Sequence, residues 1–366
     1  MRKFFYPAVP VLMVFIFFAC YSIDLTKGPD GSAPRSTSRS NTNASTSDDH
    51  HYTGVIKIYT SMYSDVVNNV EIALAKQFPN FKIEFSYGGT GTIQARIEQE
   101  IELHGKLGCD ILMVAEPSYS MELKERGLLH PFHSNYVSNL AFNYDPQGYW
   151  YPVRVSNMVL AFNPDRTPRS SVPNSFYNFA NDQSFRGLIS MTNPVTSGTA
   201  LASIAALKEE YGFTYFDALG RQNISFDSGS VALEKLQSGE YRVVMVLEES
   251  VLKLRAEERS RLEIIYPSDG IIVIPSTIMV INDSWSANAN AETAQIVADW
   301  FLSEAGQNAI VEGWMHSVRS DIRIPLNSIP TSEIISNAMP INWLYLNNDK
   351  NEIISRFEEY VIYRRQ

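Results

Sequence analysis

The sequence predicts an α/β protein with two lobes, each built around a largely parallel sheet. The first observation is length, because 366 residues are too many for one small hydrophobic core and suit two. The second is the order of patterns from Val55 onward, where strand, helix, strand and glycine-rich turn follow one another. This βαβ order is typical of parallel strands joined by right-handed crossovers.

The first lobe is predicted from short strand patterns that alternate with a helix. Residues 55–59 form a strand pattern, and Thr60 and Ser61 begin the loop after it. A helix follows over 64–77, where apolar residues recur at helical spacing. Residues 81–87 alternate like a strand, and a further strand is expected at 110–114.

The second lobe is organised around residues 242–281. Residues 243–247 are a short, wholly apolar run, which suits a strand covered on both faces. Glu248, Glu249 and Ser250 stand where this strand ends and a charged helix begins. Ligands of open α/β sheets bind beyond the carboxyl ends of strands, so this junction is a candidate site wall. Two acids at a helix start are also favourable through their charge alone, and the sequence leaves both roles open.

Three strand-to-helix turns are rich in glycine and hydroxyl groups, at 88–92, 192–199 and 227–230. Glycine lets the backbone approach a ligand, and the unpaired N–H groups of a helix start favour an anion. Each turn alone equally fits an ordinary helix cap. Together they predict a cleft lined by helix N-termini. The candidate ligand-binding residues are Thr60, Ser61, Gly89, Thr90, Thr92, Thr196, Ser197, Gly198, Thr199, Ser228, Ser230 and Glu249.

Arg154 is a further candidate, since it stands just before the apolar strand pattern at 158–162. A guanidinium there could pair with a carboxylate or phosphate of a solute. It could equally close a salt bridge between the lobes.

Residues 1–19 are predicted to be a secretory signal peptide. Arg2 and Lys3 form a basic start, and the apolar run that follows is short for a membrane span. The run ends at Ala19-Cys20, which resembles the lipobox of bacterial lipoproteins, so Cys20 is expected to carry lipid. Ordinary cleavage beside an incidental cysteine is the alternative. Residues 20–54 are expected to be a disordered tether to the periplasmic or extracellular face of the cell membrane.

Several classes of function are disfavoured by composition and motifs. GxSxG, HExxH and paired CxxC motifs are absent, so the protein is predicted not to be an enzyme and to need no cofactor. A formal net charge of −10 argues against nucleic acid as a partner. Cys109 adjoins a strand pattern and is expected to be a buried small hydrophobe. His50 and His51 are expected to belong to the solvated tether.

Several segments resemble the extracellular solute-binding proteins of ABC importers. The branch they resemble includes ferric-ion-binding proteins and binders of hexose phosphates and 2-aminoethylphosphonate. The matching segments occur in the family's order over about 55–324 and are 56–59, 109–112, 194–199, 229–233, 266–270 and 301–307. The resemblance implies a periplasmic-binding-protein fold of the type II kind, with crossover hinge strands between the lobes. It also implies delivery of a small solute to an ABC permease and its ATPase subunits.

The resemblance leaves the solute open. Ferric-binding relatives carry adjacent tyrosines after the strand that matches 243–247, whereas this chain has Glu248 and Glu249. The histidine expected after the first strand is absent, and Tyr63 stands near its position. Iron held by Tyr63 and Glu249, as transported ligand, is one alternative. An organic phosphate or phosphonate bound by the hydroxyl-rich turns is another, and other small solutes also remain open.

The resemblance and the turn pattern predict lobe 1 at 55–155, lobe 2 at 156–270, and a return to lobe 1 with C-terminal helices over 271–366. The tail over 333–366 has apolar residues at helical spacing and is expected to dock on lobe 1. Trp314, His316 and Arg319 are expected to have a packing role, and a position at the border of the cleft is the alternative. A surface adhesin without a closing cleft and a secreted hydrolase are the other function classes left open.

Overall fold

The computed structural model describes residues 54–365. The predicted signal peptide, Cys20, and the tether as far as residue 53, with His50 and His51, lie outside the described residues. Within 54–365, no helix has both the length and the apolar character needed to cross a membrane.

The described strands form one sheet in the order β2-β1-β3-β10-β5-β8-β6-β7. In lobe 1 the parallel strands are β1 (Gly54–Thr60), β2 (Phe81–Tyr87) and β3 (Ile111–Val114). In lobe 2 they are β6 (Ile189–Met191), β7 (Ser225–Phe226) and β8 (Val243–Leu247). The two parallel halves confirm the predicted two-lobed α/β fold.

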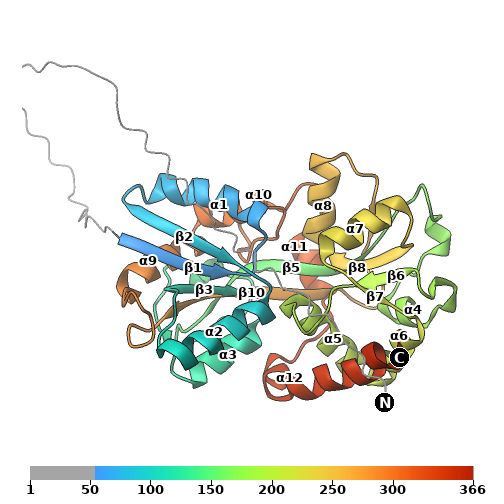
Figure 1. The fold of residues 1–366 in the computed structure, drawn as a ribbon. Coiled ribbons are helices and arrows are strands. Elements are labelled where there is room, and N and C mark those ends of the chain that lie inside the picture. Colours follow the sequence, from blue (N-terminus) through green and yellow to red (C-terminus); the bar gives the residue numbers. More distant parts are fainter. Residues whose placement is uncertain (1–53, 366) are drawn as a thin grey trace, which may run out of the picture. The chain divides into compact units, whose positions relative to one another are not determined.

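Two long antiparallel strands, β5 (Tyr151–Phe162) and β10 (Ile272–Ile281), cross between the lobes (Figure 1). The second half of β5 pairs with β8 and with β9 (Glu263–Ile265) in lobe 2. The second half of β10 pairs with β3 and with β4 (Leu129–His130) in lobe 1. The predicted lobe boundaries after residues 155 and 270 therefore fall within β5 and just before β10.

The ladder between β5 and β10 is irregular in the middle of this crossing. Pro275 lies opposite Val155, whose N–H donates to the carbonyl oxygen of His316 at 2.9 Å instead of to β10. Two residues that lie opposite each other in an antiparallel pair either exchange two backbone hydrogen bonds or exchange none. Val155 and Pro275 exchange none, so the N–H group that proline lacks costs the sheet no hydrogen bond at this position. The register then shifts between Ser276 and Thr277, as in a β-bulge.

Helices cover both faces of the lobe 1 sheet. One face carries α1 (Ser64–Gln77), α9 (Ala291–Leu302) and α10 (Glu304–Glu312), and the other carries α2 (Thr90–His104) and α3 (Pro117–Glu125) (Figure 1). Side chains of β1 alternate between the two cores, since Ile56 and Ile58 pack in one and Tyr59 in the other. Cys109 is fully buried, as predicted, and burial raises the pKa of its thiol.

The lobe 2 sheet is covered in the same way. One face carries α4 (Phe176–Asn181), α5 (Gly198–Tyr211) and α6 (Thr214–Arg221), and the other carries α7 (Gly229–Ser238) and α8 (Glu248–Glu257). In β8, Val243, Met245 and Leu247 face the first core, and Val244 and Val246 face the second. Short 3-10 turns lie at Val137–Asn139, Arg169–Ser171, Gln183–Phe185 and Tyr363–Arg365.

The C-terminal tail packs only partly as predicted. It contains α11 (Thr331–Ser336), α12 (Trp343–Phe357) and a π-helical turn (Glu358–Ile362). Ile334 joins the lobe 1 core, but Leu346, Ile353, Phe357 and Val361 are fully buried in the core of lobe 2. The tail therefore docks on both lobes, because α12 also packs against α3 of lobe 1, as expected, whereas its buried apolar side chains belong to the core of lobe 2. An apolar stripe fixes which helix face is buried, but it does not specify the partner surface.

Candidate functional site

A cavity of about 530 Å³ lies between the lobes, beyond the carboxyl ends of their parallel strands. Lobe 1 and the crossover strand β5 contribute Ser61, Met62, Tyr63, Tyr87, Gly88, Gly89, Thr90, Thr92, Ala115, Arg154 and Met158. Lobe 2 contributes Thr192, Thr196, Ser197, Gly198, Thr199, Ser228, Gly229, Val246 and Leu247. The structure therefore brings the predicted turns of both lobes together at one cavity.

Most of the predicted ligand-binding residues line this cavity, and the binding role of each stays a prediction. Thr60, Ser230 and Glu249 do not line it. Thr60 is fully buried, and its hydroxyl accepts a hydrogen bond from the N–H of Met62 at 3.1 Å, which shapes the loop after β1. Ser230 and Glu249 line an adjoining cavity of about 430 Å³, which shares Tyr63, Ser228 and Gly229 with the first.

Sequence patterns missed the residues that give the cavity its apolar parts. These are Met62, Tyr87, Ala115, Met158, Val246 and Leu247. Tyr87 is the last residue of β2 and is 46% exposed, so its position directly before the glycine-rich turn was the available signal. The others read as ordinary core residues in the sequence, because nothing in the apolar pattern marks a side chain that faces a cavity.

Several helices begin at the cavity, and their first turns differ in how they are capped. Ser197 and Ser228 cap α5 and α7, since their hydroxyls accept from the N–H groups of Ala200 and Val231 at 3.3 and 3.4 Å. The N-cap residues of α1 and α2 are Tyr63 and Gly89, and neither makes a side-chain cap hydrogen bond. The first N–H groups of α1 and α2 are therefore not satisfied by a cap side chain and suit oxygen atoms of a solute.

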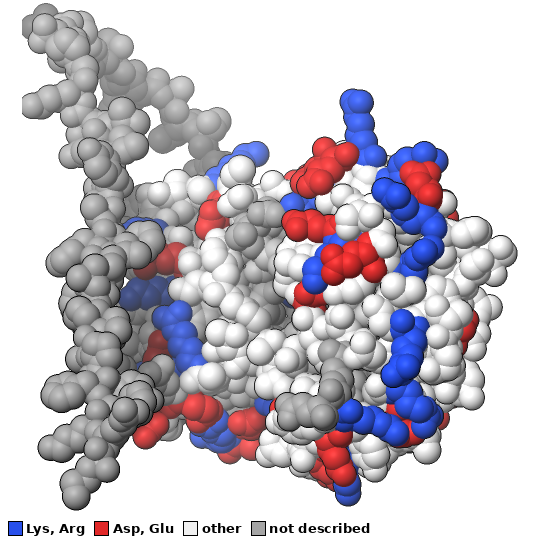
Figure 2. Space-filling model, turned by 45° about the vertical axis from the view of Figure 1, so that its right-hand side comes forward, with Lys and Arg blue, Asp and Glu red and all other residues white. Residues whose placement is uncertain are grey.

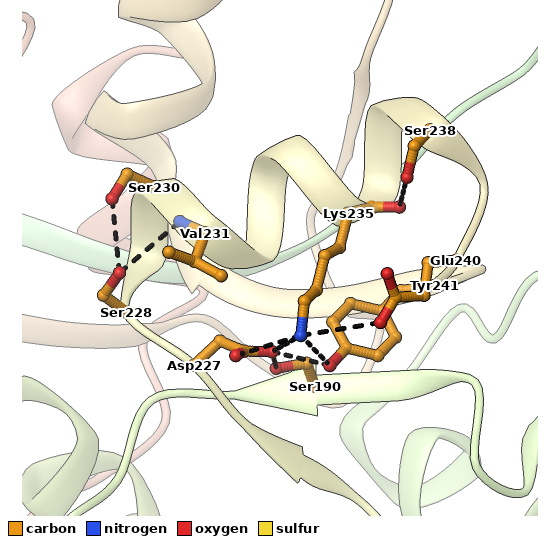
Figure 3. Close-up of polar contacts among 9 residues, drawn as sticks. All are labelled: Ser190, Asp227, Ser228, Ser230, Val231, Lys235, Ser238, Glu240 and Tyr241. Carbon is orange, nitrogen blue, oxygen red and sulfur yellow. Dashed lines mark hydrogen bonds and ion pairs between the residues drawn. The ribbon is translucent and has the colours of Figure 1, made fainter.

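The turn that carries Ser228 is held by a polar cluster around Asp227 (Figure 3). Asp227 accepts a hydrogen bond from the Tyr241 hydroxyl at 2.6 Å, and its two oxygens lie 3.3 and 3.4 Å from Nζ of Lys235. The hydroxyl of Ser190 in β6 donates to the same carboxylate at 3.5 Å. The hydrogen bond to Tyr241, followed by that to Asp227, raises the pKa of Lys235. Asp227 thus ties the start of α7 to β6 and to the segment before β8.

A buried ion pair lies at the base of the cleft. Nη1 of Arg154 lies 3.6 Å from Oε1 of Glu249, and the two side chains are 3% and 4% exposed. The hydroxyl of Ser156 accepts from Arg154 at 3.2 Å and donates to Glu249 at 2.9 Å. Burial, and then the charge of Glu248, raise the pKa of Glu249, although Arg154 and Ser156 oppose this change.

Tyr63 lies at the boundary of the two cavities and is 45% exposed. Partial removal of its hydroxyl from water by the surrounding protein raises the pKa of the Tyr63 phenol, and the negative charge of Glu249 raises it further. The neutral phenol can donate a hydrogen bond to a solute oxygen, whereas the phenolate form that a metal ion prefers is disfavoured until a cation binds.

Glu248 has a different environment from its neighbour. Its Oε2 accepts from Nδ2 of Asn157 at 2.7 Å and lies 3.1 Å from Nε2 of His316, and its Oε1 accepts from the Tyr266 hydroxyl. Nδ1 of His316 in turn contacts the Thr331 hydroxyl at 2.8 Å. Glu248, Asn157 and His316 are buried, whereas Tyr266 and Thr331 are partly exposed. Glu248 lines neither cavity, so its contacts join elements of the scaffold. His316 is buried in these contacts and lines neither cavity.

The described residues form no metal centre of His, Cys, Asp and Glu side chains. In residues 54–365, no group of three or more His, Cys, Asp or Glu side chains is placed to hold a metal ion. Figure 2 shows acidic and basic side chains intermingled on one face, without an extended basic patch in that view. Such a face offers little to a nucleic-acid backbone.

Comparisons with known proteins agree with this geometry. The family model described as bacterial extracellular solute-binding protein matches residues 109–329. No curated protein sequence matches the chain.

Solved structures with similar folds include periplasmic binding proteins. AfuA from Actinobacillus pleuropneumoniae, described with fructose-6-phosphate bound, is 18% identical with a TM-score of 0.74, over 85% of this chain and 99% of AfuA. Iron-bound HitA from Pseudomonas aeruginosa is 19% identical with a TM-score of 0.72, over 84% and 99%. A substrate-binding protein of an ABC transporter from Agrobacterium tumefaciens is 17% identical with a TM-score of 0.73, over 86% and 95%. These similarities confirm the predicted periplasmic-binding-protein fold.

Proposed function

Because the chain belongs to the bacterial extracellular solute-binding proteins, we propose that it captures an organic phosphate or phosphonate for an ABC importer. The observation that carries this proposal is the convergence of helix starts from both lobes on one cavity beside Arg154. Helix N-termini and a guanidinium both favour an oxygen-rich anion.

The uncapped start of α2 supports an anionic group in lobe 1. Gly89 offers no side chain to the first N–H groups of this helix, so they are available to a solute. The hydroxyl of Thr92 and the turn of Ser197 and Thr199 lie around the same cavity. In lobe 2, Ser197 and Ser228 cap their own helices, and their hydroxyls can still donate to a solute oxygen.

Arg154 would balance the charge of the solute at the base of the cleft. It is fully buried and already paired with Glu249, so a phosphate group would compete with this carboxylate for the guanidinium. The raised pKa of Glu249 makes the competition easier as the pH falls, because this carboxyl becomes neutral at a higher pH than an exposed one.

Iron(III) is the second candidate solute. The observation in its favour is that Tyr63 and Glu249, both oxygen donors, line the adjoining cavity. No cluster of three metal-ligating His, Cys, Asp or Glu residues occurs within 54–365, so iron would also need other oxygen donors, such as Tyr87 of the main cavity or a bound anion.

Thermal-shift and native mass spectrometry measurements with fructose 6-phosphate, 2-aminoethylphosphonate, inorganic phosphate and ferric citrate test this assignment. An organic phosphate or phosphonate that binds should raise the melting temperature by linkage. A visible charge-transfer band with ferric citrate, together with no shift for any phosphate compound, would reject the anion and support iron bound through Tyr63.

We also propose that the chain is anchored outside the cytoplasm by lipid on Cys20 and passes its solute to a permease with ATPase subunits. The lipobox-like sequence before Cys20 supports the anchor. Members of the matched family are binding proteins, which favours capture over catalysis. Fractionation tests the anchor, because Cys20→Ser should move the protein from the membrane fraction to the soluble fraction.

A further inference from the structure

The turns of the two lobes touch each other at glycine positions. A Cβ atom on Gly89 would lie 2.5 Å from the carbonyl oxygen of Thr196, and one on Gly91 would lie 2.6 Å from that of Val195. From the opposite side, a Cβ atom on Gly198 would lie 2.8 Å from Cβ and Oγ1 of Thr90. Such distances are too short for any side chain, so only glycine fits at these positions while the lobes are in this arrangement.

The glycines are required by the opposite lobe and not by their own backbone. Gly89 and Gly91 lie at the start of α2 in lobe 1, whereas Gly198 begins α5 in lobe 2. None of them has a φ angle in the left-handed region, and the φ of Gly89 is −59°. Alanine could adopt these conformations without strain, so the constraint is the backbone across the cleft.

Glycine in such turns can be required by the opposite lobe or by close contact with a bound solute. Gly91 distinguishes these two explanations. Gly89 and Gly198 line the 530 Å³ cavity, but Gly91 does not. A Cβ atom on Gly91 would also lie 3.2 Å from Cα of Thr196, so it would face the main chain of lobe 2.

A second contact between lobe 2 and α2 lies further along the same helix. Nζ of Lys350 donates to Oε1 of Gln94 at 2.6 Å. Lys350 belongs to α12, whose apolar side chains are buried in the lobe 2 core. The two lobes are therefore joined at α2 by a backbone contact at its start and by a side-chain contact one turn later.

We propose that Gly89, Gly91 and Gly198 form the surface through which the two lobes close, and that the missing Cβ atoms set how far closure goes. This inference rests on the proposed function, in which closure retains the solute. A side chain at the contact would hold the lobes apart and leave the cavity open to solvent.

The test measures how fast a chemical cross-link between the two lobes forms when no solute is present. Gln94→Cys and Lys350→Cys are joined by a short bismaleimide in the full chain carrying Cys20→Ser, where buried Cys109 is the only other thiol. Cross-linking accumulates irreversibly, so even brief closure is recorded. Adding Gly91→Ala should slow the reaction on the order of tenfold, the size expected for overpacking a close contact.

Folding stability separates this effect from damage to the helix. Gly91→Ala should keep or raise the melting temperature, because alanine is favoured over glycine in helices. Gly105→Ala is the matched control at the other end of α2, where φ is +63° and nothing lies within 4 Å of the added Cβ. It should lower the melting temperature and leave the cross-linking rate unchanged.

An unchanged cross-linking rate in Gly91→Ala would overturn the inference. With fructose 6-phosphate as the probe, Gly91→Ala should also weaken binding about tenfold if the proposed function holds. Failure of the parent chain to bind any phosphate compound would count against the proposed function alone, since the cross-linking experiment contains no solute.

Discussion

Arg154 and Glu249 form a buried ion pair, with 3.6 Å between Nη1 and Oε1, where β5 passes from one lobe to the other. The guanidinium lines the main cavity and the carboxylate lines the adjoining one. An anionic solute in the main cavity would contact Arg154 and compete with Glu249 for the guanidinium. We therefore expect the affinity of the cleft for an anion to depend on the protonation state of Glu249.

We expect anion binding to strengthen as the pH falls. The pKa of Glu249 is raised by burial and by Glu248, so the carboxyl becomes neutral at a higher pH than an exposed one. The neutral form repels an anion less and releases Arg154. Isothermal titration with 2-aminoethylphosphonate across pH 5 to 8 should show a steeper improvement toward low pH in the parent chain than in Glu249→Gln. Since ionisation of the probe is common to both proteins, parallel pH curves would contradict the prediction.

The same raised pKa has a consequence for stability. A carboxyl whose folded-state pKa lies above its unfolded value destabilises the fold at pH above the folded pKa, and this cost disappears as the pH falls through it. Glu249→Gln should therefore flatten the dependence of the free energy of unfolding on pH in this range, as urea denaturation at several pH values would measure.

Removing only one member of the pair should be costly. Arg154→Met leaves Glu249 buried without its charged partner, and such changes typically cost about 3–5 kcal/mol. The double variant Arg154→Met, Glu249→Gln should lose clearly less stability than the single variant, because no charge then remains unpaired. Urea denaturation of the parent, both single variants and the double variant measures this coupling, and additive losses would contradict it.

The cluster around Asp227 should position Ser228 for solute binding. Tyr241→Phe removes the hydroxyl that donates to Asp227 at 2.6 Å, and loss of a hydrogen bond to a charged group costs about 1.5–3 kcal/mol. We expect a lower melting temperature and weaker solute binding, because the start of α7 loses an anchor. Ser238→Ala, at the exposed end of the same helix, is the control and should change neither quantity.

The tail should be required for lobe 2 to fold. Phe357 is fully buried and meets the rings of Phe216 and Phe226 edge to face, with centroids 5.4 and 5.7 Å away. Phe357→Ala should lower the free energy of unfolding by about 3–5 kcal/mol through the cavity it leaves. Leu344→Ala, on the same helix but 57% exposed, should stay within about 0.5 kcal/mol of the parent in the same denaturation experiment.

Much of the fold could be predicted because its signals are local. The run 243–247 is apolar on both faces, and the structure places it as β8 between two cores. The hydroxyl-rich turns carry their own capping chemistry, so the starts of α5 and α7 were recognisable. Parallel sheets then bring such turns to one edge, which is why Ser197 and Ser228 could be assigned to a shared cleft from the sequence.

What could not be predicted depends on contacts between distant segments. The stripe of Ile353 and Phe357 was visible in the sequence, but its partner in lobe 2 is more than a hundred residues away. Of the adjacent acids, only Glu249 was named as a candidate ligand residue, but no pattern predicted that Glu248 contacts His316 and that Glu249 pairs with Arg154. Hydrophobic pattern determines burial, and it carries no information on which of two neighbouring carboxyls faces a cavity.

The irregular rung at Pro275 and Val155 has a mechanical consequence. Flexing of β5 against β10 at this point would break no backbone bond between them, because Val155 is anchored to His316 and proline has no proton to give. The register shift that follows between Ser276 and Thr277 interrupts the regular pairing of the two strands next to this position. We therefore expect a change in the angle between the lobes to occur at this point, because regular pairing on either side opposes sliding of one strand along the other.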